Sequence, residues 1–256
     1  MLLNLLDWQD FSCRLYALRL ISSISTARPD RTQECVYLAP LGVSRLVATL
    51  DDKREAICAE GLLLLTTLAP LSAEFQKLVA FENAFDRIFA ILHEDGSLLD
   101  ASIVIHDCLS LMAILLRFNH SNQALFRECG GVKQIANTLQ QLLREQQGLD
   151  YSHDPSNLST ARDKNLWGIL SIIRLFLVGD STIIHANQAA FWQHGVINIV
   201  LDIAFHESMG TIVRSEVRSM GGTRLELQLI MSRHLQLVQI LSAAIMCYKS
   251  NLRSAR

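Results

Sequence analysis

The sequence of 256 residues is poor in the two residues that break helices, with 4 prolines and 12 glycines. It is also poor in charge, since only 19 % of its residues are Asp, Glu, Lys or Arg. Few breakers mean few turns, and runs of strictly alternating β-branched residues are missing, which argues against a sheet. Half of the residues are apolar. Together these features predict an all-α protein made of buried helices.

The charge balance and the cysteines exclude several further classes of protein. A formal net charge of −2 provides no global field that would hold a phosphate backbone, so we expect no nucleic-acid partner. The longest stretch without a charged residue, 181–201, carries too many His, Asn and Gln side chains for a bilayer core. The six cysteines are scattered without a C-x-x-C pair, which indicates a reducing, cytosolic setting.

Sequence patterns that carry catalysis are missing as well. There is no G-x-S-x-G, no H-E-x-x-H, no phosphate-cradling G-x-x-x-x-G-K and no G-x-G-x-x-G. His106 and Cys108 lie two residues apart, a spacing that points them to different faces of a helix, and no second pair of ligands stands at metal spacing. We therefore expect no enzyme, no catalytic residue, no cofactor and no metal site.

Internal repetition is the most informative feature of the sequence. Residues 121–126 (SNQALF) lead to Gly131-Val132, and residues 186–191 (ANQAAF) lead to Gly195-Val196. Apolar residues then follow each glycine at the spacing of one helix face. Two weaker copies precede these. The four anchor positions are Gly42, Ala84, Gly131 and Gly195.

The spacing of the anchors predicts the fold class. The first two intervals, 42 and 47 residues, match armadillo and HEAT repeats, whereas the third is longer by an insertion. The sequence therefore predicts a single domain over residues 1–256, a right-handed armadillo/HEAT-like α-solenoid of about five repeats. We expect a loop insertion at 144–163, which is rich in Gly, Asp, Ser and Pro, and an irregular link at 206–222.

The segments between the anchors predict the helices themselves. A small residue at each anchor would let two helices meet at a tight turn. The strongly apolar segments are typical of helices buried between neighbouring repeats. The expected helices span 11–24, 55–69, 103–118, 166–178 and 235–248.

Polar residues inside the best repeat copies are the candidates for a partner-binding surface. Glu82, Asn83 and Arg87 lie opposite an apolar helix face, and Asn122-Gln123 recurs as Asn187-Gln188. Two plainer interpretations stand beside this one: the charged residues form a solvated face, and the Asn residues cap the helices that follow. Three aromatic residues, Phe81, Phe191 and Trp192, are expected in the core rather than at the surface.

Several ungapped blocks stand in order along the chain: Asp10-Phe11 with Arg14, 40–46, Arg54-Glu55, 60–65, 76–87, 103–109, and Asn119 with 121–123, Phe126 and Glu128. Together these blocks resemble the globular head of the general vesicular transport factor family. The resemblance covers about residues 1–130 and thins to repeat pattern alone by about residue 205.

The resemblance implies a non-enzymatic vesicle tether that acts before fusion between endoplasmic reticulum and Golgi. It implies Rab-type GTPases, golgins, SNAREs and tethering-complex subunits as partners, and a cytoplasmic location, peripheral on Golgi and transport-vesicle membranes through those partners. The resemblance also implies that members of the family dimerise through a coiled coil. The chain is expected to be a partial head, because no heptads follow and the first repeats of the family are missing.

A peptide-binding armadillo adaptor or scaffold, of the import-adaptor or catenin type, is the alternative function. Such proteins line a groove with asparagines that pair with the backbone of an extended peptide. Nine residues before Gln76 and Gln123, where that asparagine would stand, this sequence has Thr67 and Ile114. The groove chemistry of those adaptors is therefore not expected here.

Overall fold

The computed structural model describes residues 2–94, 103–148, 155–177 and 182–205. Within these ranges every regular element is a helix, which confirms the predicted all-α class. In chain order the helices are η1 (Leu2–Asp7), α1 (Phe11–Ala27), α2 (Pro29–Leu38), α3 (Gly42–Ala48), η2 (Thr49–Asp51), α4 (Glu55–Leu68), η3 (Ala69–Leu71), α5 (Ala73–Phe81), α6 (Ala84–Glu94), α7 (Ile103–Leu116), α8 (His120–Glu128), α9 (Gly131–Gly148), α10 (Pro155–Leu177), α11 (Thr182–Gln193) and α12 (Val196–Phe205).

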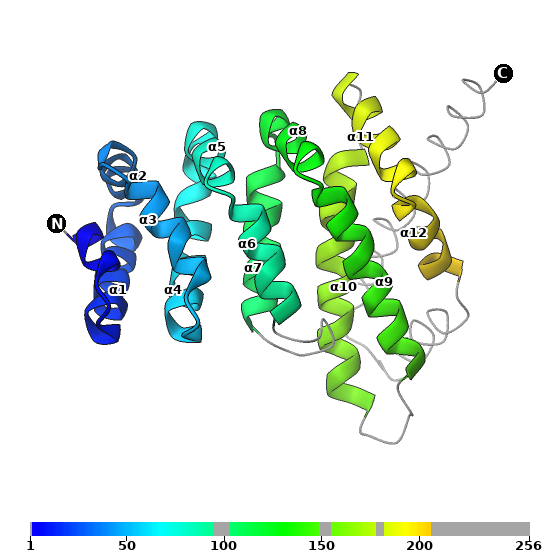
Figure 1. The fold of residues 1–256 in the computed structure, drawn as a ribbon, viewed down its shortest axis with the longest axis horizontal. Coiled ribbons are helices and arrows are strands. Elements are labelled where there is room, and N and C mark those ends of the chain that lie inside the picture. Colours follow the sequence, from blue (N-terminus) through cyan, green and yellow to red (C-terminus); the bar gives the residue numbers. More distant parts are fainter. Residues whose placement is uncertain (1, 95–102, 149–154, 178–181, 206–256) are drawn as a thin grey trace, which may run out of the picture. The chain divides into compact units, whose positions relative to one another are not determined.

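The helices form two compact units, residues 1–131 with 145–172, and residues 132–144 with 173–256. In the first unit α1 packs against α4 and α4 against α7, so that long helices stack in succession (Figure 1). The short helices α2, α5 and α8 run along one edge of this stack. This is the layered arrangement of an α-solenoid, in which each repeat buries the apolar face of its neighbour.

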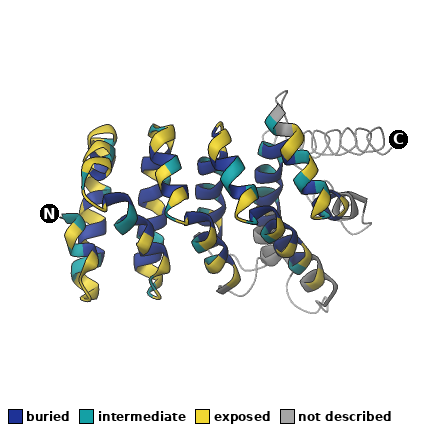
Figure 2. Ribbon diagram, turned by 45° about the horizontal axis from the view of Figure 1, so that its top comes forward, coloured by how far each residue is buried: buried dark blue, intermediate teal, exposed yellow. Residues whose placement is uncertain are grey.

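The core of the first unit lies between these layers. Leu18, Leu46 and Leu65 are completely buried. Figure 2 shows the buried residues on the facing sides of neighbouring helices, with the exposed residues at the turns and outer faces. Phe85 and Phe126 meet edge to face, with ring centroids 5.0 Å apart, which is a favourable aromatic geometry. In the second unit Phe176 and Phe191 lie 5.1 Å apart.

Three of the four predicted anchors are the first residues of helices: α3, α6 and α9 begin at Gly42, Ala84 and Gly131. The fourth predicted anchor, Gly195, lies one residue before its helix, because α12 begins at Val196. A left-handed residue stands directly before each of these helices and turns the chain. These residues are Leu41 (φ 57°), Asn83 (φ 62°), Gly130 (φ 79°) and Gly195 (φ 71°).

The physical reason for glycine differs among the anchors. A Cβ atom on Gly42 would lie 2.2 Å from the carbonyl oxygen of Val36, and one on Gly131 would lie 2.7 Å from the ring of Phe126. At these two anchors the predicted close approach is confirmed. A Cβ on Gly195 would meet nothing within 4 Å, so this glycine serves the left-handed conformation instead.

The predicted loop at 144–163 is wrong for most of its length. Helix α9 continues to Gly148, and α10 begins at Pro155, so that only 149–154 lies outside the described residues. Proline at the first position of a helix costs no hydrogen bond, and its fixed φ suits a helix start. The stretch that reads as turn-rich is therefore a helix start. The predicted link at 206–222 and the predicted helix at 235–248 also lie outside the described residues.

Three of the other predicted helices are confirmed to within a few residues at their ends: 11–24 is α1, 55–69 is α4 and 103–118 is α7. The predicted helix 166–178 is only the second half of α10, which begins eleven residues earlier, at Pro155. Helix α1 starts where it does because Asp10 caps it: a side-chain oxygen of Asp10 accepts a hydrogen bond of 2.7 Å from the Cys13 amide.

Candidate partner-binding surface

Glu82 and Asn83 form the turn between α5 and α6. Glu82 is half-buried and Asn83 is exposed. The Asn83 amide donates to the carbonyl of Ala80 (3.2 Å), and its own carbonyl accepts from the Arg87 amide (3.2 Å). Asparagine tolerates the left-handed conformation better than other residues with a side chain. Backbone hydrogen bonds thus hold the turn, and the Asn83 side chain is presented to solvent.

Arg87 is anchored to the preceding repeat. Its guanidinium forms an ion pair with Asp51 and donates to the carbonyl oxygen of Val47 (3.3 Å). This side chain joins α6 to the end of α3 and to η2. A charge reversal at Arg87 would therefore disturb packing as well as any surface chemistry.

Asn122 and Gln123 are not on the surface, contrary to the prediction. They are 1 % and 3 % exposed. The side-chain amide of Asn122 donates to the carbonyls of Gln76 (3.1 Å) and Leu115 (2.8 Å). The side-chain amide of Gln123 donates to the carbonyl of Leu116 (3.1 Å). Both side chains satisfy carbonyls that the last turn of α7 leaves without a helical partner. They are structural residues.

The capping interpretation also needs a correction. Asn119 caps α8, since its side-chain oxygen accepts a hydrogen bond from the backbone N–H of Asn122 (3.2 Å). The Asn119 side-chain nitrogen donates to Gln76 Oε1 (3.0 Å) and to the Ala73 carbonyl (3.2 Å), which ties α8 to α5. Asparagine is thus the helix cap, as expected of its chemistry, but three residues earlier than the predicted position.

The second Asn-Gln pair, in the other unit, has the same role. The side-chain amide of Asn187 donates to the carbonyl of Phe176 (3.2 Å), and that of Gln188 donates to the carbonyl of Leu177 (3.3 Å). In both copies the two side chains bond to the final carbonyls of the preceding long helix. The Asn-Gln pair therefore recurs in the sequence because it forms the same structural joint twice, and a partner-binding role is not needed to explain the recurrence.

Phe81, which sequence reasoning placed in the core, is 78 % exposed. The buried positions of α5 include Phe75, Val79 and Ala80. Phe81 comes one residue after the second of two consecutive buried positions, so the helical period turns it away from them. The helical spacing of the apolar residues could therefore have predicted from the sequence that Phe81 is exposed. Phe191 is buried as predicted, and Trp192 is half-buried.

Several residues of the matching blocks meet around Asp52. The Asp52 carboxylate, 5 % exposed, accepts from Arg54 Nε (2.9 Å) and also pairs with Arg14. Hydrogen bonds from Arg54 lower the pKa of Asp52 to about 2, and the positive charges of both arginines act in the same direction. The Arg54 guanidinium also lies 5.4 Å from the centre of the Phe11 ring. This cluster joins α1 to the start of α4.

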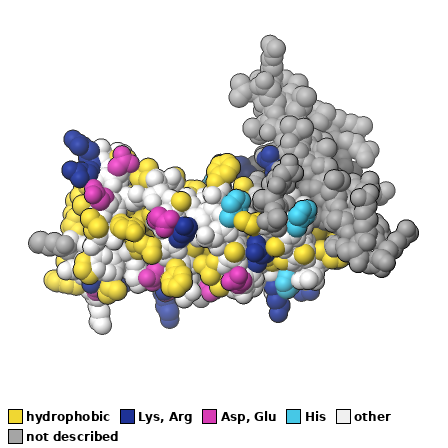
Figure 3. Space-filling view, turned by 90° about the horizontal axis from the view of Figure 1, so that it is seen from above, with side chains coloured by type: hydrophobic (Ala, Val, Ile, Leu, Met, Phe, Trp, Pro, Cys, Tyr) yellow, Lys and Arg dark blue, Asp and Glu magenta, His cyan; other side chains and the backbone are white. Residues whose placement is uncertain are grey.

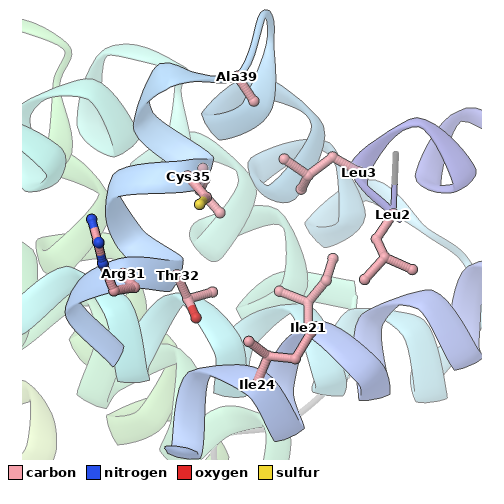
Figure 4. Close-up of a pocket in the computed structure, with 9 residues that line it drawn as sticks. Leu2, Leu3, Ile21, Ile24, Arg31, Thr32, Cys35 and Ala39 are labelled. Carbon is pink, nitrogen blue, oxygen red and sulfur yellow. The ribbon is translucent and has the colours of Figure 1, made fainter. Parts of the chain in front are cut away.

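An apolar pocket opens among η1, α1 and α2 (Figure 4). Its volume is about 430 Å³. The polar groups on its wall are engaged locally: the Thr32 hydroxyl donates to the Arg28 carbonyl (2.9 Å), and Arg31 pairs with Glu34. No acid–base pair stands in it. Its other lining residues are Leu2, Leu3, Ile21, Ile24, Cys35, Val36 and Ala39.

The face of the described residues seen in Figure 3 carries no large field of one charge. On the face shown in Figure 3, hydrophobic side chains are interspersed with acidic and basic ones. Among the described residues no group of three His, Cys, Asp or Glu side chains is placed to hold a metal ion. No described helix is both long enough and apolar enough to span a bilayer.

Individual relatives, and no family model, show which family the chain belongs to. It is 33 % identical over 215 residues to the intracellular protein transport protein USO1 of Saccharomyces cerevisiae, covering 84 % of this chain and 12 % of that protein. It is 42 % identical over 128 residues to the human general vesicular transport factor p115, covering 50 % and 13 %. The crystal structure of Uso1-2 superimposes with a TM-score of 0.71 at 33 % identity, over 80 % of this chain and 29 % of that one.

The chain is a homologue of the Uso1/p115 vesicular transport factors. The chain spans only 12 % to 19 % of the length of three of these relatives, namely Uso1 from two yeasts and human p115. Golgin candidate 6 of Arabidopsis thaliana is a further relative, 42 % identical over 109 residues, which are 43 % of this chain and 12 % of that protein. The Uso1 and p115 relatives are transport proteins by name, and the predicted resemblance to the general vesicular transport factor family is confirmed.

Designed armadillo repeat proteins share the fold alone. One of them, YIII(Dq)4CqI, superimposes with a TM-score of 0.58 over 96 % of this chain and 98 % of its own, at 16 % identity. This likeness confirms the predicted armadillo-like solenoid. It carries no argument for peptide binding, because identity at this level says nothing about the residues of a groove.

Proposed function

We propose that this chain is a non-enzymatic, protein-binding module of a vesicle tether in transport between endoplasmic reticulum and Golgi. The homology to Uso1 and p115 carries the proposal, because it extends over most of the chain at 33 % identity to Uso1. The apolar pocket without an acid–base pair and the mixed-charge face are consistent with a scaffold whose chemistry is binding.

The proposed contact surface is the α5–α6 turn, namely Phe81, Glu82 and Asn83, referred to below as the turn surface. It combines a 78 % exposed aromatic ring with an acidic and an amide side chain on a backbone held by hydrogen bonds. An exposed aromatic side chain on a rigid frame is the kind of group that contributes most to protein interfaces. The backbone amide of Arg87 donates to the Asn83 carbonyl and so helps to hold this turn. Asn122 and Gln123 are excluded from the surface by burial.

The partners proposed for the turn surface are those that the family implies: Rab-type GTPases, golgins, SNAREs or subunits of a tethering complex. Membrane association would then be peripheral and through these proteins, at the cytoplasmic face of Golgi and transport-vesicle membranes. The absence of a described helix able to cross a bilayer leaves this route open.

Binding measurements with purified partners test the proposal. The full chain, immobilised, is exposed to Rab-type GTPases loaded with GTP analogue or GDP, and separately to golgin and SNARE fragments. We expect binding of at least one partner, weakened at least tenfold by Phe81→Ser or Glu82→Lys. Asn83→Gly removes the amide side chain but keeps the left-handed turn, so it separates side-chain contact from turn geometry.

The matched control is Leu38→Ser, which removes a 70 % exposed apolar side chain at the end of α2, the corresponding short helix of the preceding repeat. It should leave binding unchanged. A partner that binds equally to wild type and to both turn variants would exclude the turn surface while leaving the tethering role intact. Failure of every partner class to bind would count against the tethering role itself.

A further inference from the structure

The turn surface carries negative charge that no described residue compensates. Glu82 is half-buried, and Asp86, in the first turn of α6, is exposed. Neither carboxylate forms an ion pair with a residue that the structure describes. Both belong to the short stretch of chain that follows the exposed ring of Phe81 directly. An aromatic ring and two unpaired carboxylates are therefore presented together.

The basic residue of this stretch, Arg87, is occupied by the preceding repeat. Its guanidinium pairs with Asp51 and donates to the carbonyl oxygen of Val47 (3.3 Å), and its side chain is only 24 % exposed. The charges of Arg87 and Asp51 cancel each other. The pair thus adds no positive charge to the turn surface, which keeps the net negative charge of Glu82 and Asp86.

The corresponding turns before α3 and α9 lack this combination. The three turns match at their left-handed residues, Leu41, Asn83 and Gly130. The residues two positions before these are Ala39, Phe81 and Glu128, and the residues three positions after them are Ser44, Asp86 and Lys133. Of these three turns, only the one between α5 and α6 joins an aromatic ring to acidic side chains. The repeat architecture requires the left-handed residue and leaves its neighbours free to vary.

Another part of the chain shows how a ring and a carboxylate hold an arginine. The Arg54 guanidinium lies 5.4 Å from the centre of the Phe11 ring, and its Nε donates to Asp52 (2.9 Å). The ring attracts the cation through its π-electrons, and the carboxylate attracts it by charge. Consecutive side chains at a helix end point in different directions, so one arginine would not reach both Phe81 and Glu82. A segment with several basic residues would.

We propose that the turn surface binds a basic, arginine-rich segment of a partner protein. One guanidinium packs on the Phe81 ring, and others lie near the carboxylates of Glu82 and Asp86. The proposal rests on the proposed function, since it takes the turn surface as the contact site, and it adds the charge of the partner. An anionic membrane or a nucleic acid would be repelled by the same carboxylates.

Fluorescence anisotropy with three labelled 16-residue peptides tests the proposal on the full chain. Each peptide has four residues of one kind, spaced by glycine and serine: arginine in the first, glutamine in the second and glutamate in the third. We expect the arginine peptide to bind, and the other two to bind at least tenfold more weakly. Raising the salt from about 50 mM to about 300 mM should weaken the arginine peptide at least fivefold, because exposed charges are screened.

Matched variants locate the site. Phe81→Ser, Glu82→Gln and Asp86→Asn should each weaken binding of the arginine peptide at least threefold. Glu128→Gln removes the same charge as Glu82→Gln, but from the exposed glutamate of the next turn, and should change binding less than twofold. Phe118→Gly removes a 92 % exposed ring from a different turn and should be equally without effect. Far-UV circular dichroism shows whether each variant keeps its helices, and the three turn variants alter different side chains.

Four results would overturn the proposal. They are absence of binding by the arginine peptide, equal binding by the glutamine peptide, binding unaffected by all three turn variants, and an equal loss in Glu82→Gln and Glu128→Gln, which would show attraction by overall charge alone.

The transport partners distinguish this proposal from the proposed function. A partner that loses affinity in Phe81→Ser, together with no binding by the arginine peptide, would retain the turn surface and exclude its basic occupant. If neither a partner nor the peptide responds to any turn variant, the turn surface itself is wrong.

Discussion

Replacing Asp52 by asparagine should remove a pH-dependent part of the stability that joins α1 to α4. The carboxylate is 5 % exposed and is bonded by Arg54 and paired with Arg14. Asparagine keeps the shape but removes the charge, leaving the Arg14 side chain, 16 % exposed, opposite a neutral amide. Breaking one side of a well-buried ion pair is costly because the remaining charge is uncompensated.

The magnitude follows from the pKa of Asp52. Arg54 hydrogen bonds lower it from 3.8 to about 2, and each pKa unit corresponds to about 1.4 kcal/mol, so the folded state gains about 2 kcal/mol from the ionised carboxylate. Because the folded pKa is the lower one, this contribution is complete above pH 4 to 5. About 1 kcal/mol of it is lost by pH 3, and most of it by pH 2, as pH falls through the folded pKa.

The assay is urea unfolding followed by circular dichroism at pH 7, 4, 3 and 2.5, at constant ionic strength. We expect Asp52→Asn to be less stable than wild type by about 2–4 kcal/mol at pH 7, with the difference shrinking below pH 4. The control is Glu74→Gln, which removes a pair with Lys77 whose side chains are 68 % and 42 % exposed. It should change stability by less than about 0.5 kcal/mol. A difference at pH 7 that persists unchanged at pH 2.5 would refute the reasoning.

Three other perturbations test the joints between repeats. Asn122→Ala should destabilise the chain by about 2 kcal/mol in thermal unfolding, because the carbonyls of Leu115 and Gln76 each lose a buried side-chain donor; an unchanged Tm would contradict this. Gly131→Ala should cost about 1–3 kcal/mol in urea unfolding through its clash with the Phe126 ring, whereas Gly130→Asn, with open space and a left-handed φ, should cost less than about 1 kcal/mol. Phe118→Gly should raise or preserve stability, by up to about 1 kcal/mol, because Phe118 is 92 % exposed at a φ of 56°; a large loss of stability would show that the ring has a partner.

The helix positions could be predicted from sequence because they depend on local chemistry. Few breakers, apolar segments at helical spacing and small residues at regular intervals placed α1, α4 and α7 within a few residues of their ends. The same local reasoning was wrong at 144–163, because Pro155 begins a helix as readily as it ends one. A pattern that is compatible with both a loop and a helix start is decided by packing, which the local pattern does not contain.

The candidate site was only partly predictable. Glu82 and Asn83 do form an accessible turn, but Asn122 and Gln123 are buried although their sequence context is the same repeat unit. Polar character indicates that a side chain needs hydrogen-bond partners and is silent on whether water or a carbonyl provides them. The last turn of α7 offers two carbonyls without helical donors, and the neighbouring helix α8 places both amides against them.

By itself the sequence determined the all-α class, the repeat interval and the relationship to vesicular transport factors, since these depend on composition, periodicity and ordered matching blocks. Only the tertiary structure decided which polar residues are joints and which are surface. It joined Asp52 to Arg14 and Arg54, turned Phe81 outward, and set Arg19 beside Glu60 across α1 and α4. Such pairings depend on how layers stack, and stacking places side by side residues that lie about forty positions apart in the chain.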